Sequence, residues 1–339
     1  MLTSLPIIIA LYLALAALTV FSTIRASFFV NELDKKTKIS GALIGGVLLA
    51  TVTSLPEFIT SITSTVVLDE PGLAFGNVFG SNMFNLLILA VVDLVFIKHL
   101  FFNKTTTGLK TNSLIVMMYV ILVLPVLLSR LNESLGYGTF DVRLGIAFNV
   151  VSLLIILVYF LALRSMNKEL PQEKLGSTDR PMKQILMGFF FWAVIVVVTS
   201  YFVTVVTNDL SRELNLSASF AGAIFLGVAT SLPEMTAVIY LVRIRNYDVA
   251  LGNILGSNIF NMTIISVVDF INFRTHIYDA VAREAGLGKN VSLLLILGLI
   301  NSIMVLVALK RKPQKNLVLY ALPSVVIIIS YVVYIALSI

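Results

Sequence analysis

The chain has 339 residues, of which 58% are hydrophobic and 12% are charged, and its mean hydropathy is +0.98. A soluble domain carries about 25% charged residues, so this composition excludes a soluble globular fold. The absence of cysteine excludes disulfides and thiolate metal sites, and basic loops explain the net charge of +6 without nucleic acid binding.

Apolar stretches long enough to cross a bilayer recur along the chain, and ten of them are predicted to be membrane-spanning helices. In chain order they lie at about 6–30, 40–67, 72–97, 112–129, 143–163, 184–207, 217–242, 247–271, 291–309 and 317–337. The first stretch lacks a basic leader and a small-residue cleavage site, so it is interpreted as a retained helix. The predicted fold class is therefore an all-α integral membrane protein.

Lys and Arg are distributed unevenly among the loops. The loops after spans 1, 3, 5, 7 and 9 contain 18 of the 24 basic residues. The positive-inside rule makes these loops cytoplasmic, so both chain ends are predicted to lie outside a cell (plasma) membrane. The basic clusters at 35–38 and 310–315 are interpreted as topological anchors, with lipid or regulator binding as the alternative. The polar segment 166–182 is interpreted as a cytoplasmic linker.

Two blocks of sequence occur twice. Thr-Ser-Leu-Pro-Glu recurs at an offset of 177 residues, and Gly-Asn-x-x-Gly-Ser-Asn-x-Phe-Asn recurs at an offset of 176. The motif segments are 41–57 and 76–85 in the first half, and 222–234 and 252–261 in the second half. The chain is therefore predicted to be a duplication, with one five-helix repeat at 1–165 and another at 183–339.

The two repeats are predicted to have opposite orientations in the membrane, because five spans, an odd number, separate the copies of each motif. Inverted repeats of this kind are typical of secondary transporters, which hold their substrate near the midplane between the halves. Spans 2, 3, 7 and 8, which carry the motifs, are predicted to be broken helices that form a midplane cation site.

Glu57 and Glu234 are the strongest candidate functional residues. Each lies within a span between apolar flanks, where a carboxylate is costly and indicates function by default. The proline before each glutamate cannot donate a backbone hydrogen bond. Backbone carbonyls that become available as ligands are predicted near four residues, which are Ala50, Thr53, Gly227 and Thr230. A structural alternative is a buried polar pair that locks the halves together.

The second block adds oxygen-bearing side chains. Ser81 and Asn85 share a helix face at i, i+4, and Ser257 and Asn261 repeat that spacing. Its Gly-x-x-x-Gly pairs allow close helix packing. Oxygen donors alone suit hard cations such as Ca²⁺ and Na⁺, and two carboxylates balance one Ca²⁺ or two Na⁺. No cofactor is predicted.

Asp93 and Asp269 form a third matched pair, each in Val-Val-Asp. They follow Ser81 and Ser257 by 12 residues, about 18 Å along a helix, which is too far for a ligand of the same site. Polar contacts at helix ends are the predicted role, with an access-path charge as the alternative.

These motifs resemble the repeats of the cation/Ca²⁺ exchanger superfamily, specifically the sodium/calcium exchanger branch in its short prokaryotic form. The resemblance implies that Glu57 and Glu234 bind Ca²⁺ directly and that the carbonyls of Thr53 and Thr230 complete its site. It further implies that the motif serines bind Na⁺, namely Ser54, Ser231, Ser81 and Ser257. Two asparagines, Asn85 and Asn261, would complete the central site.

One position departs from the family pattern. Sodium/calcium exchangers usually carry Asp where this chain has Asn261. Three Na⁺ on two carboxylates would leave an uncompensated buried charge, so an exchange of Ca²⁺ for two monovalent cations with little net current is expected. Gly80 and Ser81 stand where the proton/calcium branch usually has an acidic residue, which favours Na⁺ over H⁺.

The resemblance implies Ca²⁺ export in exchange for Na⁺ by alternating access, in a chain functional as a monomer, with spans 1 and 6 sliding across the core. A H⁺/Ca²⁺ antiporter, transport of Mg²⁺, Mn²⁺, K⁺ or Li⁺, and a cation channel remain open. An intramembrane enzyme is disfavoured, because the glutamates have no nucleophile, His pair or HExxH motif beside them.

Overall fold

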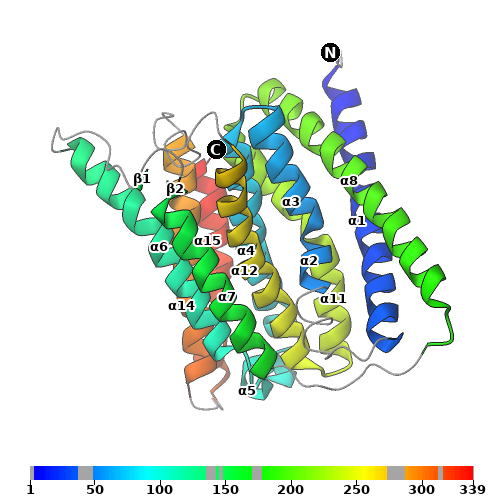
Figure 1. The fold of residues 1–339 in the computed structure, drawn as a ribbon. Helices are drawn as coiled ribbons and strands as arrows, with labels where there is room; N and C mark the ends of the chain where they lie inside the picture. The colour runs from blue at the N-terminus through cyan, green and yellow to red at the C-terminus, as the bar shows by residue number, and fades with distance from the viewer. Residues whose placement is uncertain are drawn as a thin grey trace.

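The computed structural model describes residues 4–36, 49–134, 143–144, 148–169, 178–272, 287–311 and 316–338. These residues are almost entirely helical (Figure 1). The long helices are α1 (Leu5–Lys36), α4 (Pro71–Val95), α6 (Leu109–Ser134), α7 (Val150–Glu169), α8 (Met182–Glu213), α12 (Tyr247–Ile271), α14 (Leu287–Lys310) and α15 (Leu317–Ser338). Short turns of helix, η3 (Ile97–His99) and α5 (Phe101–Lys104), follow α4.

In the described part of the chain, six continuous helices are long and apolar enough to cross a membrane, and a bent pair makes a seventh candidate. The apolar segments Leu109–Val123 and Val150–Arg164 are shorter. This confirms a helical membrane protein, although fewer full-length spans are found than the ten predicted. Residues 40–48 of the predicted second span lie outside the described residues.

The predicted fifth span, 143–163, begins too early. Two short strands, β1 (Arg143–Leu144) and β2 (Phe148–Asn149), pair antiparallel before α7 begins at Val150. Polar residues at Arg143 and Asn149 interrupt the apolar run there, so the helix starts only after them. Apart from these two short paired strands, the regular secondary structure of the described residues is helical, as predicted.

Helix breaks occur in spans 2 and 7 at the Thr-Ser-Leu-Pro-Glu blocks. In the first block, α2 (Leu49–Thr53) ends and α3 (Leu55–Ile62) begins around Ser54, and in the second α10 (Gly227–Thr230) is followed by α11 (Leu232–Arg243). Ser54 and Ser231 leave helical geometry in the same way, with φ −91° in both and ψ 9° and 1°. The axis of span 7 bends by 45° at this point. Proline at the second position of each following helix removes a backbone donor, which accounts for both breaks.

Spans 3 and 8 were predicted to be broken, and that prediction is wrong. Both α4 and α12 are continuous helices of 25 residues. The glycines and asparagines of their motifs lack the covalent restriction that proline imposes, so they remain helical and use their small or polar side chains for contacts.

Two π-helical segments were not predicted. They are η2 (Thr63–Val67), which follows α3, and η4 (Gly222–Leu226), which lies between α9 (Ala218–Ala221) and α10. Segments of this kind insert an extra residue per turn and occur often at functional sites. In this chain η4 packs directly against α4.

The centre of the molecule is formed by α4 and α12. In their most apolar segments, 72% of α4 and 78% of α12 is buried, against 28% of α1 and 33% of α8. The two central helices also exchange partners between the repeats, since α4 packs on α9, η4 and α10, and α12 packs on α2 and α3. The repeats are therefore interlocked rather than side by side.

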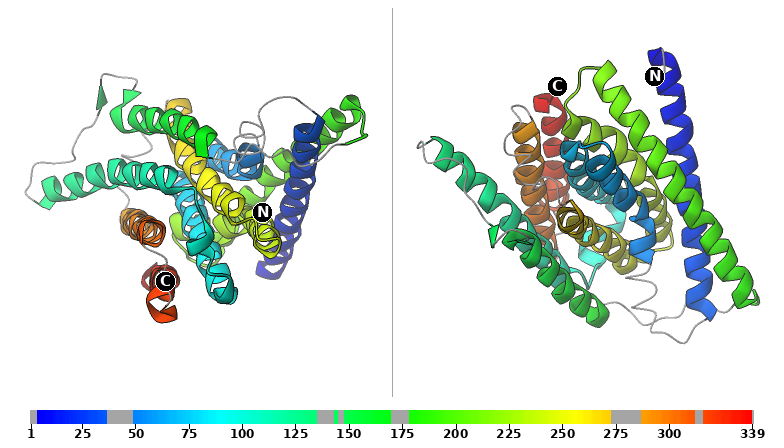
Figure 2. Two further views of the ribbon diagram at one scale, coloured as in Figure 1. Left: turned by 90° about the horizontal axis from the view of Figure 1, so that it is seen from below. Right: turned by 45° about the horizontal axis from the view of Figure 1, so that its top comes forward.

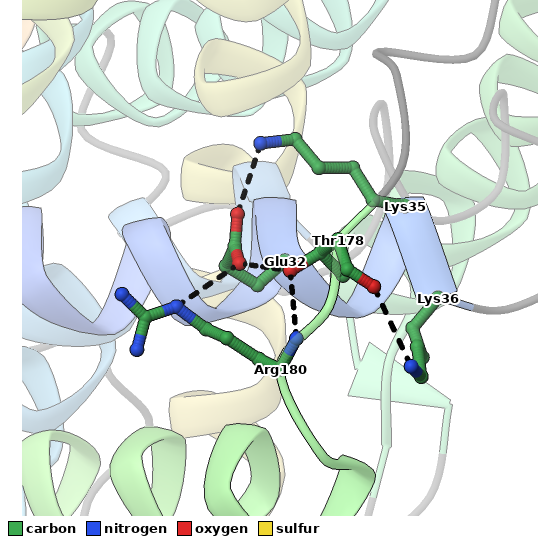
Figure 3. Close-up of polar contacts among 5 residues, drawn as sticks. All are labelled: Glu32, Lys35, Lys36, Thr178 and Arg180. Atoms are coloured by element: carbon green, nitrogen blue, oxygen red, sulfur yellow. Dashed lines mark hydrogen bonds and ion pairs between the residues drawn. The ribbon is translucent and has the colours of Figure 1, made fainter.

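At the periphery, α1 and α8 pack against each other along their length and run in opposite directions (Figures 1 and 2). The C-terminal end of α1 and the segment just before α8 are joined by a polar cluster around Glu32 (Figure 3). Glu32 accepts hydrogen bonds from Lys35 (2.9 Å) and Thr178 (2.6 Å), and Arg180 forms an ion pair with it at 3.3 Å. At its other end α8 reaches the core through an ion pair between Arg212 and Glu70 at 3.1 Å.

Asp93 and Asp269 hold helices together near the ends of α4 and α12. Asp93 accepts hydrogen bonds from Tyr320 and, at 2.6 Å, from Ser324, both on α15. Asp269 accepts one from Ser152 of α7 at 2.7 Å. The predicted polar contacts at helix ends are confirmed, and each contact joins one repeat to the other.

Candidate cation site

The two motif glutamates lie directly after the helix breaks. Glu57 is in the first turn of α3 and Glu234 is in the first turn of α11, where the helix dipole favours a negative charge. Both side chains are fully buried. The two carboxylates also interact electrostatically with each other. Opposite repeats therefore bring two buried acids to one place.

The polar neighbours of each glutamate come from both repeats. Those of Glu57 are Ser81, Thr230 and Ser231. Those of Glu234 are Thr53 and Ser257, and the Ser257 hydroxyl donates to Glu234 Oε1 at 3.2 Å. The predicted threonines and three of the four predicted serines thus meet around the carboxylates.

Several oxygens in this cluster have no hydrogen-bond partner within the described residues. They are both carboxylate oxygens of Glu57, Oε2 of Glu234, the hydroxyls of Ser54 and Ser231, and Oδ1 of Asn85 and Asn261. All of these side chains are buried. A buried polar atom without a partner costs about 1–3 kcal/mol, and more when it is charged. Oxygens gathered without protein donors are what a bound hard cation would satisfy.

One of the predicted carbonyl ligands accepts a hydrogen bond from a site serine. The Gly227 carbonyl, a predicted ligand, accepts a hydrogen bond from the Ser81 hydroxyl at 3.2 Å. The same hydroxyl lies 3.3 Å from Thr230 Oγ1, which in turn donates to the Leu226 carbonyl at 2.9 Å. Gly227 therefore has a protein partner in this conformation. Ala50 lies in α2, just before the break at Ser54.

Asn85 and Asn261 are each hydrogen-bonded to an asparagine of the opposite central helix that is not among the predicted site residues. Asn85 Nδ2 donates to Asn258 Oδ1 at 2.9 Å, and Asn261 Nδ2 donates to Asn82 Oδ1 at 3.1 Å. Asn82 and Asn258 belong to the repeated Gly-Ser-Asn triplet, so their recurrence was the available signal. Their role depends on contacts between helices that the spacing within one helix does not reveal.

Glycines allow α4 to approach the first half of span 7. A Cβ on Gly76 would lie 2.0 Å from the Ser219 carbonyl oxygen, and one on Gly80 would lie 2.4 Å from Ala223 Cα. A Cβ on Gly227 would lie 2.8 Å from the backbone nitrogen of Ser81. Backbone contact at these positions places Ser81 beside the second repeat's break, so the glycines build the site as well as pack the helices.

Solved structures similar to this chain include two cation exchangers. The H⁺/Ca²⁺ exchanger CAX aligns over 98% of this chain and 86% of its own, with a TM-score of 0.68 and 14% identity. The sodium-calcium exchanger NCX_Mj aligns over 98% of this chain and 99% of its own, with a TM-score of 0.55 and 18% identity. At these identities the likeness concerns the fold.

The amino-acid sequence identifies the family to which the chain belongs. Residues 7–166 and 184–339 match the model described as "Sodium/calcium exchanger protein", and the chain belongs to that family. The inner membrane protein YrbG of Escherichia coli (strain K12) is 30% identical over 255 residues, 73% of this chain and 74% of YrbG. The putative antiporter CaxA of Alkalimonas amylolytica is 26% identical over 256 residues, 72% of this chain and 74% of CaxA. The protein is a multi-pass membrane transporter of the cation/calcium exchanger type, not an enzyme.

Proposed function

We propose that this protein exports Ca²⁺ in exchange for Na⁺ by alternating access, and that Glu57 and Glu234 bind both ions in turn. The observation that carries the proposal is the pair of buried, electrostatically interacting carboxylates, of whose four oxygens three have no hydrogen-bond partner among the described residues. Such a pair is costly when empty, because two like charges lie together away from water. A divalent cation, or two monovalent cations, removes that cost.

The charge of the site supports an electroneutral stoichiometry. Asn85 and Asn261 are neutral, and the described residues contain no cluster of three acidic, His or Cys side chains that could bind a metal. Two carboxylates balance one Ca²⁺ or two Na⁺. The proposed cycle therefore exchanges one Ca²⁺ for two monovalent cations, with the motif threonines and serines as further ligands.

The peripheral pair α1 and α8 is the proposed moving unit. It is much less buried than α4 and α12. Its inner faces carry small hydroxyl side chains, including Thr23 of α1 and Ser200 and Thr204 of α8, which are fully buried. Small side chains at a helix interface allow the backbones to approach closely without bulky interlocking groups. Movement of this pair against the interlocked centre would expose the site to each side alternately.

The proposed organisation follows the repeats. Residues 1–165 and 183–339 form the inverted halves, and the cytoplasmic segment 166–182 joins them. In this proposal both termini face the outside of the cell. The N- and C-terminal ends of the structure lie at the same side of the molecule, which supports this arrangement (Figure 1). One chain contains a whole site from both repeats, so we propose that the monomer is functional.

Proton coupling is the second candidate. Two interacting buried carboxylates repel each other when both are ionised, and a shared proton relieves this repulsion as Na⁺ does. An H⁺/Ca²⁺ antiporter would use the same residues and the same alternating access. A cation channel, by contrast, would pass Ca²⁺ without any counter-ion gradient.

Uptake of ⁴⁵Ca²⁺ into proteoliposomes separates these functions. An imposed Na⁺ gradient should drive uptake, a pH gradient of equal size should not, and clamping the membrane potential at different values should change the flux little. Uptake driven only by the pH gradient would establish proton coupling instead. Uptake that needs neither gradient would indicate a channel, and a steep dependence on potential would refute the two-for-one stoichiometry.

A further inference from the structure

Two asparagines that lie outside the predicted ligand set connect the central helices. Asn82 of α4 donates from Nδ2 to the backbone carbonyl of Asn258 at 3.2 Å. Asn258 of α12 donates from Nδ2 to the carbonyl of Asn82 at 3.3 Å. Both side chains are fully buried. The exchange is reciprocal, so it follows the inverted symmetry of the repeats.

The side-chain oxygens of the same two residues hold the predicted ligands in a crossed pattern. Asn82 Oδ1 accepts from Asn261, and Asn258 Oδ1 accepts from Asn85. Each of these asparagines thus binds the ligand residue of the other repeat. All four residues together form one closed amide network between α4 and α12.

The network decides which atom each ligand residue can offer. A carboxamide has a donor NH₂ group at one end and an acceptor oxygen at the other. Because the NH₂ groups of Asn85 and Asn261 are held by acceptors, their orientation is fixed. The oxygens of both remain buried and without a hydrogen-bond partner among the described residues. These oxygens are the atoms that can bind a cation.

We propose that Asn82 and Asn258 are positioning residues, which orient Asn261 and Asn85 so that each presents its oxygen to the transported cation. This inference rests on the proposed function, since it assigns a ligand role to Asn85 and Asn261. Its distinguishing feature is the crossing: Asn82 acts through Asn261, and Asn258 acts through Asn85.

In this network Asn82 Oδ1 accepts a hydrogen bond from position 261, so it requires a donor such as an amide there. An ionised aspartate there would have no N–H to donate, and one of its oxygens would face Asn82 Oδ1. To donate to it, Asn82 would have to turn its amide and give up the bond to the Asn258 carbonyl. A neutral amide at position 261 therefore keeps the whole network satisfied and leaves the site with two carboxylates.

Equilibrium ⁴⁵Ca²⁺ binding to the purified full-length protein tests the inference through double-mutant cycles. The positioning variants are Asn82→Leu and Asn258→Leu, which keep the approximate side-chain volume without polar atoms, and the ligand variants are Asn85→Ala and Asn261→Ala. Each single substitution should weaken Ca²⁺ affinity by on the order of 10-fold, as the loss of a residue that orients a metal ligand does.

The crossed pairs should be non-additive. Asn82→Leu should cause no further loss in the Asn261→Ala background but its full loss in the Asn85→Ala background, and Asn258→Leu should do the reverse. If the leucine variants do not fold, Asn82→Ala and Asn258→Ala provide the same comparison. Equal, additive losses of Ca²⁺ affinity in all four double variants would overturn the inference, because they would show that neither Asn82 nor Asn258 acts through a particular ligand residue. A wild-type protein that binds neither Ca²⁺ nor Na⁺ would instead overturn the proposed function.

Discussion

At the scale of single residues, the site is defined by oxygens that the protein leaves without donors. The hydroxyls of many buried Ser and Thr residues donate to a carbonyl one turn earlier, as Thr63, Ser64 and Thr207 do. The hydroxyls of Ser54 and Ser231 have no such partner within the described chain. Because both lie at helix breaks, the usual acceptor is displaced, and the hydroxyl is available to an ion.

Removal of either carboxylate charge should abolish exchange. Glu57→Gln and Glu234→Gln keep side-chain size but leave one negative charge, which cannot balance Ca²⁺ in a buried site. Uptake of ⁴⁵Ca²⁺ should fall by at least 100-fold, whereas Glu213→Gln, at an exposed position of α8, should transport normally. Normal flux in either glutamine variant would refute the site assignment.

An added carboxylate should make exchange electrogenic. Asn261→Asp makes the charge of the site more negative, from −2 to −3, which is enough to balance a third monovalent cation. Calcium flux in this variant should depend strongly on a clamped membrane potential, while the neutral control Asn261→Ser should not gain that dependence. A flux in Asn261→Asp that stays independent of potential would show that this position does not set the stoichiometry.

At the scale of secondary structure, the prolines of the first motif and the glycines of the second motif have different effects. Pro56 and Pro233 break their spans through a local covalent effect. The motif glycines of α4 leave the helix intact and allow backbone contact with the second repeat. Each kind of residue is needed, because a break without close packing would leave the carboxylates apart.

The close packing predicts a sharp effect of one methyl group. Gly80→Ala places a Cβ against the backbone of Ala223, which cannot move without displacing η4. The expected cost is about 1–3 kcal/mol or more, seen as a lower unfolding temperature in detergent and reduced Ca²⁺ uptake. In the control Gly188→Ala the new Cβ meets only the ring of Phe29, which can rotate, so both quantities should stay near wild type.

The polar cluster of Figure 3 predicts a smaller effect on the peripheral helix pair. Glu32→Gln keeps a bond to Thr178 but weakens the ion pairs with Lys35 and Arg180. Partly exposed ion pairs contribute about 0.2–1 kcal/mol each, so stability should fall by about 1 kcal/mol. Thermal unfolding in detergent measures this. Lys36→Gln, which loses only a 3.4 Å contact, should be neutral, and equal effects of both changes would contradict the assigned role.

At the scale of the whole molecule, two repeats meet at one site, and we propose that they have opposite orientations in the membrane. Contacts such as α4 with α15 and α12 with α7 cross between the repeats. The halves therefore cannot separate during a transport cycle without breaking the core. This arrangement favours the proposed movement of the less buried α1 and α8.

Cysteine labelling tests the orientation directly, because the chain has no natural cysteine. Glu213→Cys lies at the end of α8 that is predicted to be outside, and Lys98→Cys lies in η3, which is predicted to be cytoplasmic; both positions are exposed. A membrane-impermeant maleimide should label the first in intact cells and the second only after permeabilisation. The reverse pattern would invert the topology, and labelling of both in intact cells would contradict the span assignment between them.

The sequence by itself determined the membrane class, the duplication, the buried glutamates and the breaks at the proline blocks. These follow from composition, from repetition and from a covalent property of proline, which act locally. The tertiary structure decided that α4 and α12 are continuous, that Ser81 bonds the Gly227 carbonyl, and that Asn82 and Asn258 hold the opposite repeat's amides. The bonds of Ser81, Asn82 and Asn258 depend on contacts between residues about 150–180 positions apart, whose geometry the spacing of residues along one helix does not specify.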